Sequence, residues 1–114
     1  MKGAAGADKR GLDQVAYFVL HCVDAPGAAP LRAQHRPAHL EHIRNSGKVR
    51  VAGPLLDEDE AMIGSLIIVE ARDMEAARAF SQADPFSREG VFGSVDIQRF
   101  AMSFTDLRTE DETA

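Results

Sequence analysis

The stretch MIGSLIIVEARDMEAARAF, residues 62–80, decides the fold because it joins a buried strand directly to an amphipathic helix. Residues 62–71 are almost continuously apolar, which is typical of a strand that is covered on both faces. Asp73 can cap the helix that follows, and Glu75 in its first turn favours the same start. The apolar face of this helix is expected to comprise Met74, Ala77 and Phe80, together with Ala76 or Ala83.

Three further stretches are expected to form strands. Residues 15–22, VAYFVLHC, are apolar on both faces, like residues 62–71. Residues 48–56, KVRVAGPLL, alternate and predict a half-buried strand, in which Gly53-Pro54 marks a bulge or a sheet edge. In the last strand, residues 94–104, the apolar side chains change face after Ile97. This change indicates a bulge, or a far end of the strand that is buried against something new.

A longer helix is expected between the first two strands, from Leu31 to Ser46, with Gly47 as its natural end. Pro37 lies inside it, so either the helix is kinked there or Pro37 opens a second helical segment. The apolar stripe of this helix is expected to hold Leu31, Ala38, Ile43 and Leu40, with Arg32, Arg36, Glu41 and Arg44 outside it.

These elements follow one another in the order β-α-β-β-α-β, which predicts an α+β protein with the ferredoxin-like fold. In this fold a four-stranded antiparallel sheet carries both helices on one face. The other face would be left bare, although the first and third strands are apolar on both sides. A second copy of the chain is the simplest cover, so we expect a symmetric homodimer.

Length and composition set outer limits on function. The 114 residues suit a single domain, which we place at residues 15–104 between flexible tails at residues 1–14 and 105–114. The net charge of −5 argues against a nucleic-acid partner, and no run is long and apolar enough to suggest a membrane partner. The single cysteine, Cys22, and an N-terminal stretch without a signal-like apolar core favour a cytoplasmic location.

Several short motifs, taken in order, resemble the YciI-like (YCII-related) family over roughly Tyr17 to Phe104. They are RPAHL at residues 36–40, AGP at 52–54, GS at 64–65, DPF at 84–86 and VDIQRF at 95–100. The resemblance implies a ferredoxin-like fold of the dimeric α/β-barrel type. It also implies an active site built on a histidine and an aspartate, which match His39 and Asp84. Some relatives remove HCl from a hydroxylated aromatic ring, and others occur beside regulatory domains.

A pair formed by His39 and Asp84 would be suited to proton transfer near neutral pH. Imidazole accepts and returns protons in this range, and a neighbouring carboxylate fixes its tautomer and stabilises the imidazolium. Pro85 places Asp84 at a corner of the chain, from which the carboxylate can point back to the first helix. The alternatives are a cap for the turn that begins at Pro85, in the case of Asp84, and a helix-flank position for His39.

Three other residues are candidates for substrate binding. Arg36 could hold an anionic group through a forked contact, or it could be solvated or paired with Glu41 or Glu89. His21 could line the same pocket or be a core histidine that is bonded to the backbone. Tyr17 could offer its hydroxyl to the pocket, although packing is the alternative duty.

The spacing of His35, His39 and His42 would allow two of them to chelate a metal on a regular helix. Pro37 disturbs the first pair, however, and neither CxxC nor HExxH occurs. We therefore expect no metal site, and the absence of a glycine-rich phosphate loop gives no support for a nucleotide cofactor. The roles of His35 and His42 stay open.

Together these features predict a small cofactor-independent enzyme with lyase or isomerase chemistry. A His39–Asp84 dyad would move a proton on a small cyclic or carbonyl compound, with aromatic-compound breakdown as one setting. The alternative is a non-catalytic homodimeric module that binds a small anionic or aromatic molecule, or regulates through it. A third reading is a structural homodimer in which the polar residues only cap and solubilise.

Overall fold

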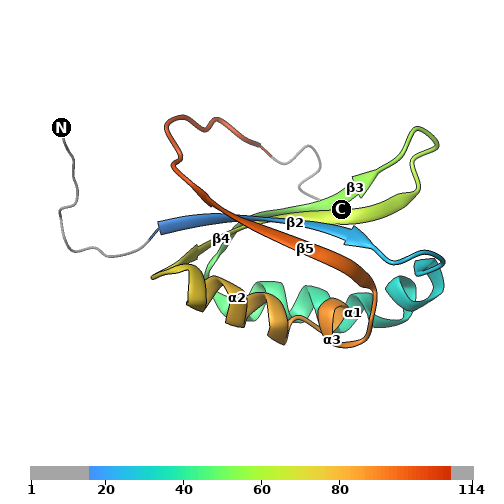
Figure 1. Ribbon diagram of the computed structural model, residues 1–114. Coiled ribbons are helices and arrows are strands. Elements are labelled where there is room, and N and C mark those ends of the chain that lie inside the picture. Colours follow the sequence, from blue (N-terminus) through green and yellow to red (C-terminus); the bar gives the residue numbers. More distant parts are fainter. Residues whose placement is uncertain (1–15, 109–114) are drawn as a thin grey trace.

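The computed structural model describes residues 16–108 and shows one antiparallel sheet with all its helices on one side (Figure 1). The elements are β2 (Ala16–Asp24), α1 (Ala29–Ser46), β3 (Val49–Leu56), β4 (Met62–Ala71), α2 (Met74–Ala83), α3 (Pro85–Arg88) and β5 (Phe92–Phe100). Their order confirms the predicted β-α-β-β-α-β pattern, with α3 as one extra turn. Val15 and the tail expected at residues 1–14 lie outside the described residues, as do residues 109–114.

The strands follow the order β3-β4-β2-β5, and every neighbouring pair is antiparallel. This is the ferredoxin-like fold that the sequence predicts. β2 and β4 occupy the centre, which agrees with their apolar character on both faces. β3 lies at an edge, where Pro54 removes a backbone donor, and the strand continues through it.

The apolar core lies between the central strands and α2. Phe18, Leu20 and Cys22 of β2 pack with Ile67 and Val69 of β4. From α2, Ala77 is buried, and Met74 and Phe80 pack around it at half-buried positions, as expected. Ala76 and Ala83 are exposed. The predicted cap is confirmed, because the Ala76 N–H donates to the carboxylate of Asp73 at 2.8 Å.

The inner face of α1 differs from the predicted apolar stripe. Arg32 and His39 are its buried residues, whereas Leu31 and Ala38 are exposed. Leu40 and Ile43 are half-buried, as expected of the stripe. The prediction was wrong for Arg32 because it assumed that charge faces water, and this guanidinium finds buried partners instead. Pro37 is exposed within one continuous helix, so it does not open a second segment.

The last strand ends at Phe100, earlier than predicted, and residues 101–108 have no regular secondary structure. The pairing of β2 with β5 shifts register only between Val23 and Asp24, so the bulge expected beyond Ile97 is not present. The alternative of a buried far end is not met either, because Phe100 and Met102 are only half-buried and Phe104 is 83% exposed. Phe100 and Met102 line a cavity of about 400 Å³ on the sheet face away from the helices.

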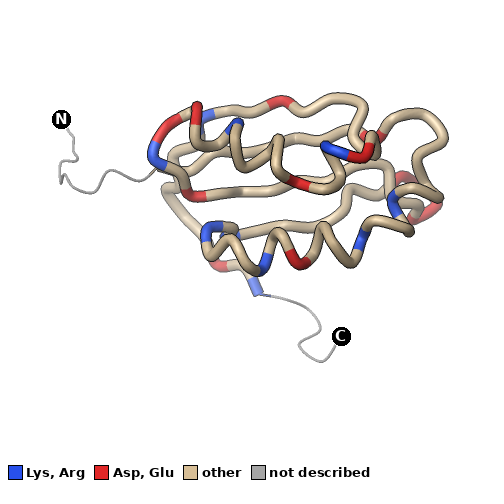
Figure 2. The backbone as a smooth tube through the Cα atoms, turned by 90° about the horizontal axis from the view of Figure 1, so that it is seen from below, with Lys and Arg blue, Asp and Glu red and all other residues tan. Residues whose placement is uncertain are grey.

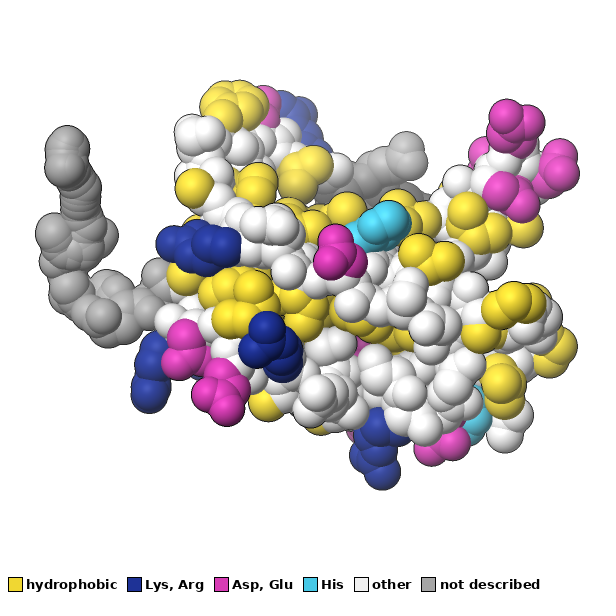
Figure 3. Space-filling view, in the orientation of Figure 1, with side chains coloured by type: hydrophobic (Ala, Val, Ile, Leu, Met, Phe, Trp, Pro, Cys, Tyr) yellow, Lys and Arg dark blue, Asp and Glu magenta, His cyan; other side chains and the backbone are white. Residues whose placement is uncertain are grey.

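Charges of both signs are spread over the helical side of the molecule (Figure 2). Figure 3 shows hydrophobic side chains along the upper side, where the sheet faces away from the helices. Within residues 16–108, no helix has the length and apolar character needed to cross a membrane.

Gly64 on β4 provides a test of the central strand pairing. A Cβ at this position would overlap the carbonyl oxygen of Cys22 on β2, so a side chain must push the two strands apart. We expect Gly64→Ala to lower the free energy of unfolding by about 2 kcal/mol. Gly53→Ala is the matched control, because nothing lies within 4 Å of its Cβ, and it should change stability by less than about 0.5 kcal/mol. Equal effects in urea denaturation would contradict this packing.

Cys22 provides a test of burial. Burial, reinforced by the nearby Asp84 carboxylate, raises the pKa of the Cys22 thiol from 9.0 to about 12. Native protein should therefore react with iodoacetamide at about pH 8 at least about a hundredfold more slowly than urea-unfolded protein. Because only the unfolded chain loses this proton just above pH 9, the raised pKa also makes stability fall as pH rises from 9.0 toward 12. Equal alkylation rates in the two states would show that the thiol is accessible.

Candidate active site

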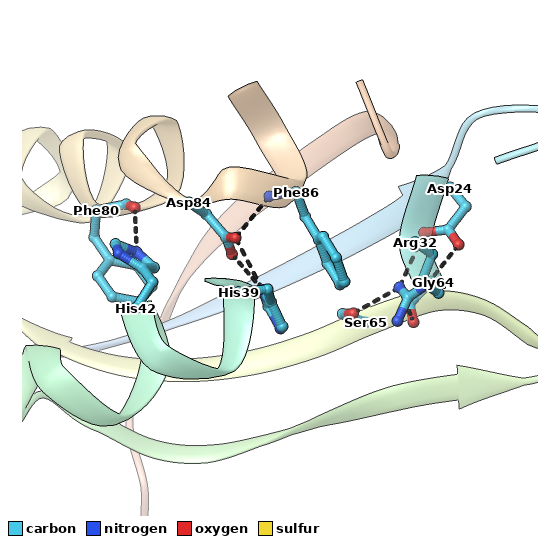
Figure 4. Close-up of polar contacts among 9 residues, drawn as sticks. All are labelled: Asp24, Arg32, His39, His42, Gly64, Ser65, Phe80, Asp84 and Phe86. Atoms are coloured by element: carbon cyan, nitrogen blue, oxygen red, sulfur yellow. Dashed lines mark hydrogen bonds and ion pairs between the residues drawn. The ribbon is translucent and has the colours of Figure 1, made fainter. Parts of the chain in front are cut away.

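His39 and Asp84, 45 positions apart in the sequence, meet in a buried hydrogen bond (Figure 4). The Nδ1 atom of His39 lies 2.8 Å from Oδ1 and 3.1 Å from Oδ2 of Asp84. The relative exposures of the two residues are 7% and 1%. A carboxylate can only accept, so Nδ1 carries the proton of this bond and the neutral ring keeps its lone pair on Nε2. Within the described part of the chain, Nε2 has no hydrogen-bond partner.

Asp84 is held in place by the corner between α2 and α3. Its backbone is extended, as expected before Pro85, and its N–H donates to the carbonyl oxygen of Ser81 at 3.2 Å. Its Oδ1 accepts the Phe86 N–H at 2.9 Å, so the predicted cap of α3 is present. One carboxylate therefore caps a helical turn and orients His39 at the same time.

Phe86 fixes the plane of the imidazole. Its ring is stacked on that of His39, with centroids 4.0 Å apart and planes 5° from parallel. The Cζ atom of Arg32 lies 4.8 Å from the centre of the same ring. In the close-up, Phe86 lies between His39 and Arg32 (Figure 4). The histidine is thus restrained by a hydrogen bond in its plane and by an aromatic ring against its face.

Arg32 forms a second buried polar cluster beside the dyad. Its Nε and Nη2 atoms donate to the two carboxylate oxygens of Asp24, at 2.8 and 3.0 Å. Nη2 also donates to the carbonyl oxygen of Gly64 at 2.8 Å and to Oγ of Ser65 at 2.9 Å. This forked pair ties the end of β2 to α1 and β4, and it leaves neither charge buried alone.

A small cavity of about 140 Å³ joins the two clusters. Its charged and polar lining comes from Arg32, Arg36, His39 and Ser65. Leu40, Ile43, Ala52, Gly53 and Pro54 complete the wall. The site therefore lies between α1 and the β3–β4 edge of the sheet, and the predicted candidate Arg36 is at its rim. Arg36 makes no ion pair or hydrogen bond within residues 16–108. It is therefore not paired with Glu41 or Glu89, which was the alternative predicted from the sequence.

The structure does not bring His21 and Tyr17 to this cavity. Side chains alternate along a strand, and Leu20 and Cys22 of β2 point into the core on the helical side. His21 and Tyr17 therefore lie on the opposite face, with the sheet between them and His39. The prediction that they could line the same pocket treated the first strand as if both of its faces bordered one cavity.

The two other histidines of α1 stay apart from the dyad. His42 is stacked on Phe80 and bonds its carbonyl oxygen through Nε2 at 3.2 Å, which joins α1 to α2. His35 is half-buried and makes no hydrogen bond in the described region. Among residues 16–108, no three His, Cys, Asp or Glu side chains are grouped closely enough to hold a metal ion.

Sequence reasoning missed four residues of the site, namely Asp24, Arg32, Ser65 and Phe86. One signal could have found Arg32, because it lies seven residues before His39 and so shares a helix face with it. Ser65 follows Gly64 in the sequence, but no nucleophile motif surrounds it that would mark it as a functional residue. The residues in contact with Arg32 come from β2, β4 and α3, so their meeting depends on the tertiary structure.

Comparison with known proteins shows the family to which this chain belongs. Residues 16–101 match the YCII-related domain. Protein YciI of Escherichia coli is 30% identical over 96 residues, which cover 76% of this chain and 98% of that protein. An uncharacterized protein of Haemophilus influenzae is 25% identical over 97 residues, which cover 77% and 99%.

Solved structures of similar proteins share this fold. The 5-chloro-2-hydroxyhydroquinone dehydrochlorinase TftG of Burkholderia phenoliruptrix, in complex with 2,5-dihydroxybenzoquinone, matches with a TM-score of 0.68 and 30% identity. The match covers 75% of this chain and 93% of that one. A Pseudomonas aeruginosa protein shares the fold, with a TM-score of 0.51 and 17% identity over 80% of this chain and 96% of that one. The family suggested by the sequence motifs is confirmed, and the chain belongs to the YCII-related family.

Proposed function

We propose that this protein is a cofactor-independent enzyme that transfers a proton on a small cyclic or carbonyl compound. His39 is its general acid and base, and Asp84 orients it. The observation that carries the proposal is the direction of the imidazole. Nδ1 is bonded to Asp84 at 2.8 Å, while the ring lines the cavity beneath α1. The lone pair that can accept a proton is thus on the nitrogen that Asp84 does not occupy.

The dyad has the properties that a reversible proton carrier needs. When Nε2 takes a proton from the substrate, the imidazolium gains a charge-assisted bond to the Asp84 carboxylate. The stack on Phe86 keeps the ring in place while its charge changes. The proton can then be returned to another atom of the substrate or to a leaving group. Such lyase or isomerase chemistry requires no redox group.

One similar protein with a named reaction, TftG, supports this class of chemistry. Dehydrochlorination by TftG removes the elements of HCl from 5-chloro-2-hydroxyhydroquinone. On this chain we propose that Nε2 of His39 moves one hydroxyl proton to the ring carbon that bears chlorine, and that it then takes a second hydroxyl proton while the electron pair of the C–Cl bond leaves with chloride. The ring then becomes a hydroxybenzoquinone, and no oxidant is consumed. Arg36, at the rim of the cavity, is the proposed substrate-binding residue. His21 and Tyr17 lie on the other side of the sheet and have no role in this proposal.

We also propose that the working form is a homodimer, joined through the helix-free sheet face. Val51, Ile68 and Val19 are aligned across three strands on that face, and all three are only half-buried. A soluble monomer would leave this apolar row in contact with water. A second copy would cover it with the same residues. A cytoplasmic location remains our expectation, on the basis of the single cysteine.

The catalytic role can be tested with the chlorinated substrate of the relative. Wild-type protein should release chloride from 5-chloro-2-hydroxyhydroquinone, measured with an ion-selective electrode. His39→Gln should lower the rate by about a hundredfold or more, because it removes the base. Asp84→Asn keeps the acceptor for the Phe86 N–H but loses the charge, and should cost at least about tenfold.

His35→Gln is the matched control, since His35 lies one turn earlier on α1 and bonds to nothing in the described region. It should retain the wild-type rate. A wild-type protein that binds the compound but releases no chloride would contradict the enzyme proposal for this substrate and favour a binding or regulatory module. Equal loss in His35→Gln and His39→Gln would refute the special role of His39.

The dimer can be tested by placing a charge on the helix-free face. Wild-type protein should sediment as a dimer at micromolar concentration, whereas Ile68→Asp should sediment as a folded monomer, because two carboxylates would be buried at the interface. Ala79→Asp adds the same charge at an exposed position of α2 and should leave the dimer intact. A monomeric wild type, or dissociation by both variants, would argue against this interface.

A further inference from the structure

Some of the hydrogen-bond donors that line the cavity have no acceptor within residues 16–108. Both carboxylates beside it are engaged, since Asp24 accepts from Arg32 and Asp84 accepts from His39 and the Phe86 N–H. Arg32 is 5% exposed. It uses Nε and Nη2, and Nη1 has no partner within residues 16–108. A nearly buried guanidinium therefore lines the cavity with an unused donor nitrogen.

The hydroxyl of Ser65 adds a second unused donor. Oγ of Ser65 accepts a hydrogen bond from Arg32 at 2.9 Å, so its own proton must point elsewhere. No acceptor for that proton occurs within the described residues, although Ser65 is only 2% exposed. Ser65 lines the same cavity as His39 and lies between His39 and Arg32 in the close-up (Figure 4). A buried hydroxyl without an acceptor is costly unless a ligand or water supplies one.

Arg36 contributes a third set of donors from the rim. Its guanidinium has no ion-pair partner within residues 16–108 and lines the cavity one helical turn before His39. The cavity thus presents donors from Arg32, Ser65 and Arg36, whereas the acceptors on its lining side chains are limited to Nε2 of His39, when the ring is unprotonated, and the second lone pair of the Ser65 oxygen. A ligand that satisfies these donors must carry an oxygen atom that can accept several hydrogen bonds. An anionic oxygen fits best, because hydrogen bonds to a charged acceptor are stronger.

The size of the site limits the rest of the ligand. The cavity of about 140 Å³ is smaller than typical drug-sized pockets, which begin near about 300 Å³. Arg32 and His39 lie seven residues apart on α1, which is about 10 Å along the helix, and the Phe86 ring lies between them. Since the single ring of Phe86 reaches from Arg32 to His39, one substituted ring in the neighbouring cavity is long enough to reach from the donor end to the dyad. A cavity of this volume does not suit a larger group.

We propose that the Arg32 Nη1 group, the Ser65 hydroxyl and Arg36 form an anion subsite, and that the substrate is a single-ring compound with one anionic oxygen. This inference rests on the proposed function and adds the substrate's charge and size to it. The anionic oxygen is held at the Arg32 end, and the proton that His39 takes lies at the opposite end of the ring. Ser65 is thereby a substrate-binding residue.

The test compares benzoate with benzamide, a neutral molecule of nearly the same shape, by NMR titration of the full chain. Wild-type protein should bind benzoate at least about tenfold more tightly, as expected for hydrogen bonds to a charged group. Ser65→Ala and Arg36→Gln should each lower this preference about fivefold or more. Arg44→Gln is the control, because it removes the same charge from an exposed position of α1 outside the cavity. Circular dichroism melting establishes that each variant is folded.

Three results would overturn the inference. They are absence of saturable benzoate binding, equal binding of benzamide, and equal loss of preference in Arg44→Gln and Arg36→Gln, which would indicate a general charge effect. His39→Gln separates this inference from the proposed reaction, because it should keep the preference for benzoate while losing chloride release. If the preference is present but wild-type protein releases no chloride, the anion subsite stands and the proposed reaction fails.

Discussion

The buried carboxylate of Asp84 is the group on which the rest of the site depends. A carboxylate at 1% exposure is unstable in an apolar interior unless several donors satisfy it, and here the donors are the Phe86 N–H and Nδ1 of His39. The same bonds that stabilise the charge join α1 to the corner between α2 and α3. The stack of Phe86 on His39 follows from the cap, because the residue that donates its N–H to Asp84 also contributes the ring.

The two long helices, α1 and α2, bury different kinds of side chain against the sheet. α2 buries Ala77 and packs Met74 and Phe80 against the sheet, so it contributes apolar burial to stability. α1 instead turns Arg32 and His39 inward, each with a carboxylate partner from another element. The protein thus accepts the cost of burying polar groups on one helix, where their fixed positions serve a site. The other helix and the central strands supply the apolar core.

The sequence predicts the fold well because the strands and α2 follow simple periods. Asp73 and Gly47 mark helix ends as expected, and the two central strands are those that are apolar on both faces. The prediction failed where polar groups replaced apolar ones, because periodicity cannot tell a buried Arg32 from a solvated one. It also extended the last strand beyond Phe100, where apolar side chains continue after the pairing has stopped. His39 and Asp84 were predicted from motifs, whereas the contacts of Arg32 required the tertiary structure.

The central claim is that Asp84 holds His39 as the Nδ1–H tautomer, with Nε2 left free for chemistry. The most direct measurement is nitrogen NMR of the protein with isotopically labelled histidine side chains, under conditions in which His39 is neutral. The account predicts that Nδ1 carries the proton and Nε2 does not, and that Asp84→Asn disturbs this assignment while His35 keeps its own signals. A neutral His39 whose proton is on Nε2 in the wild-type protein would contradict the account, because the nitrogen lining the cavity would then have no lone pair to accept a proton.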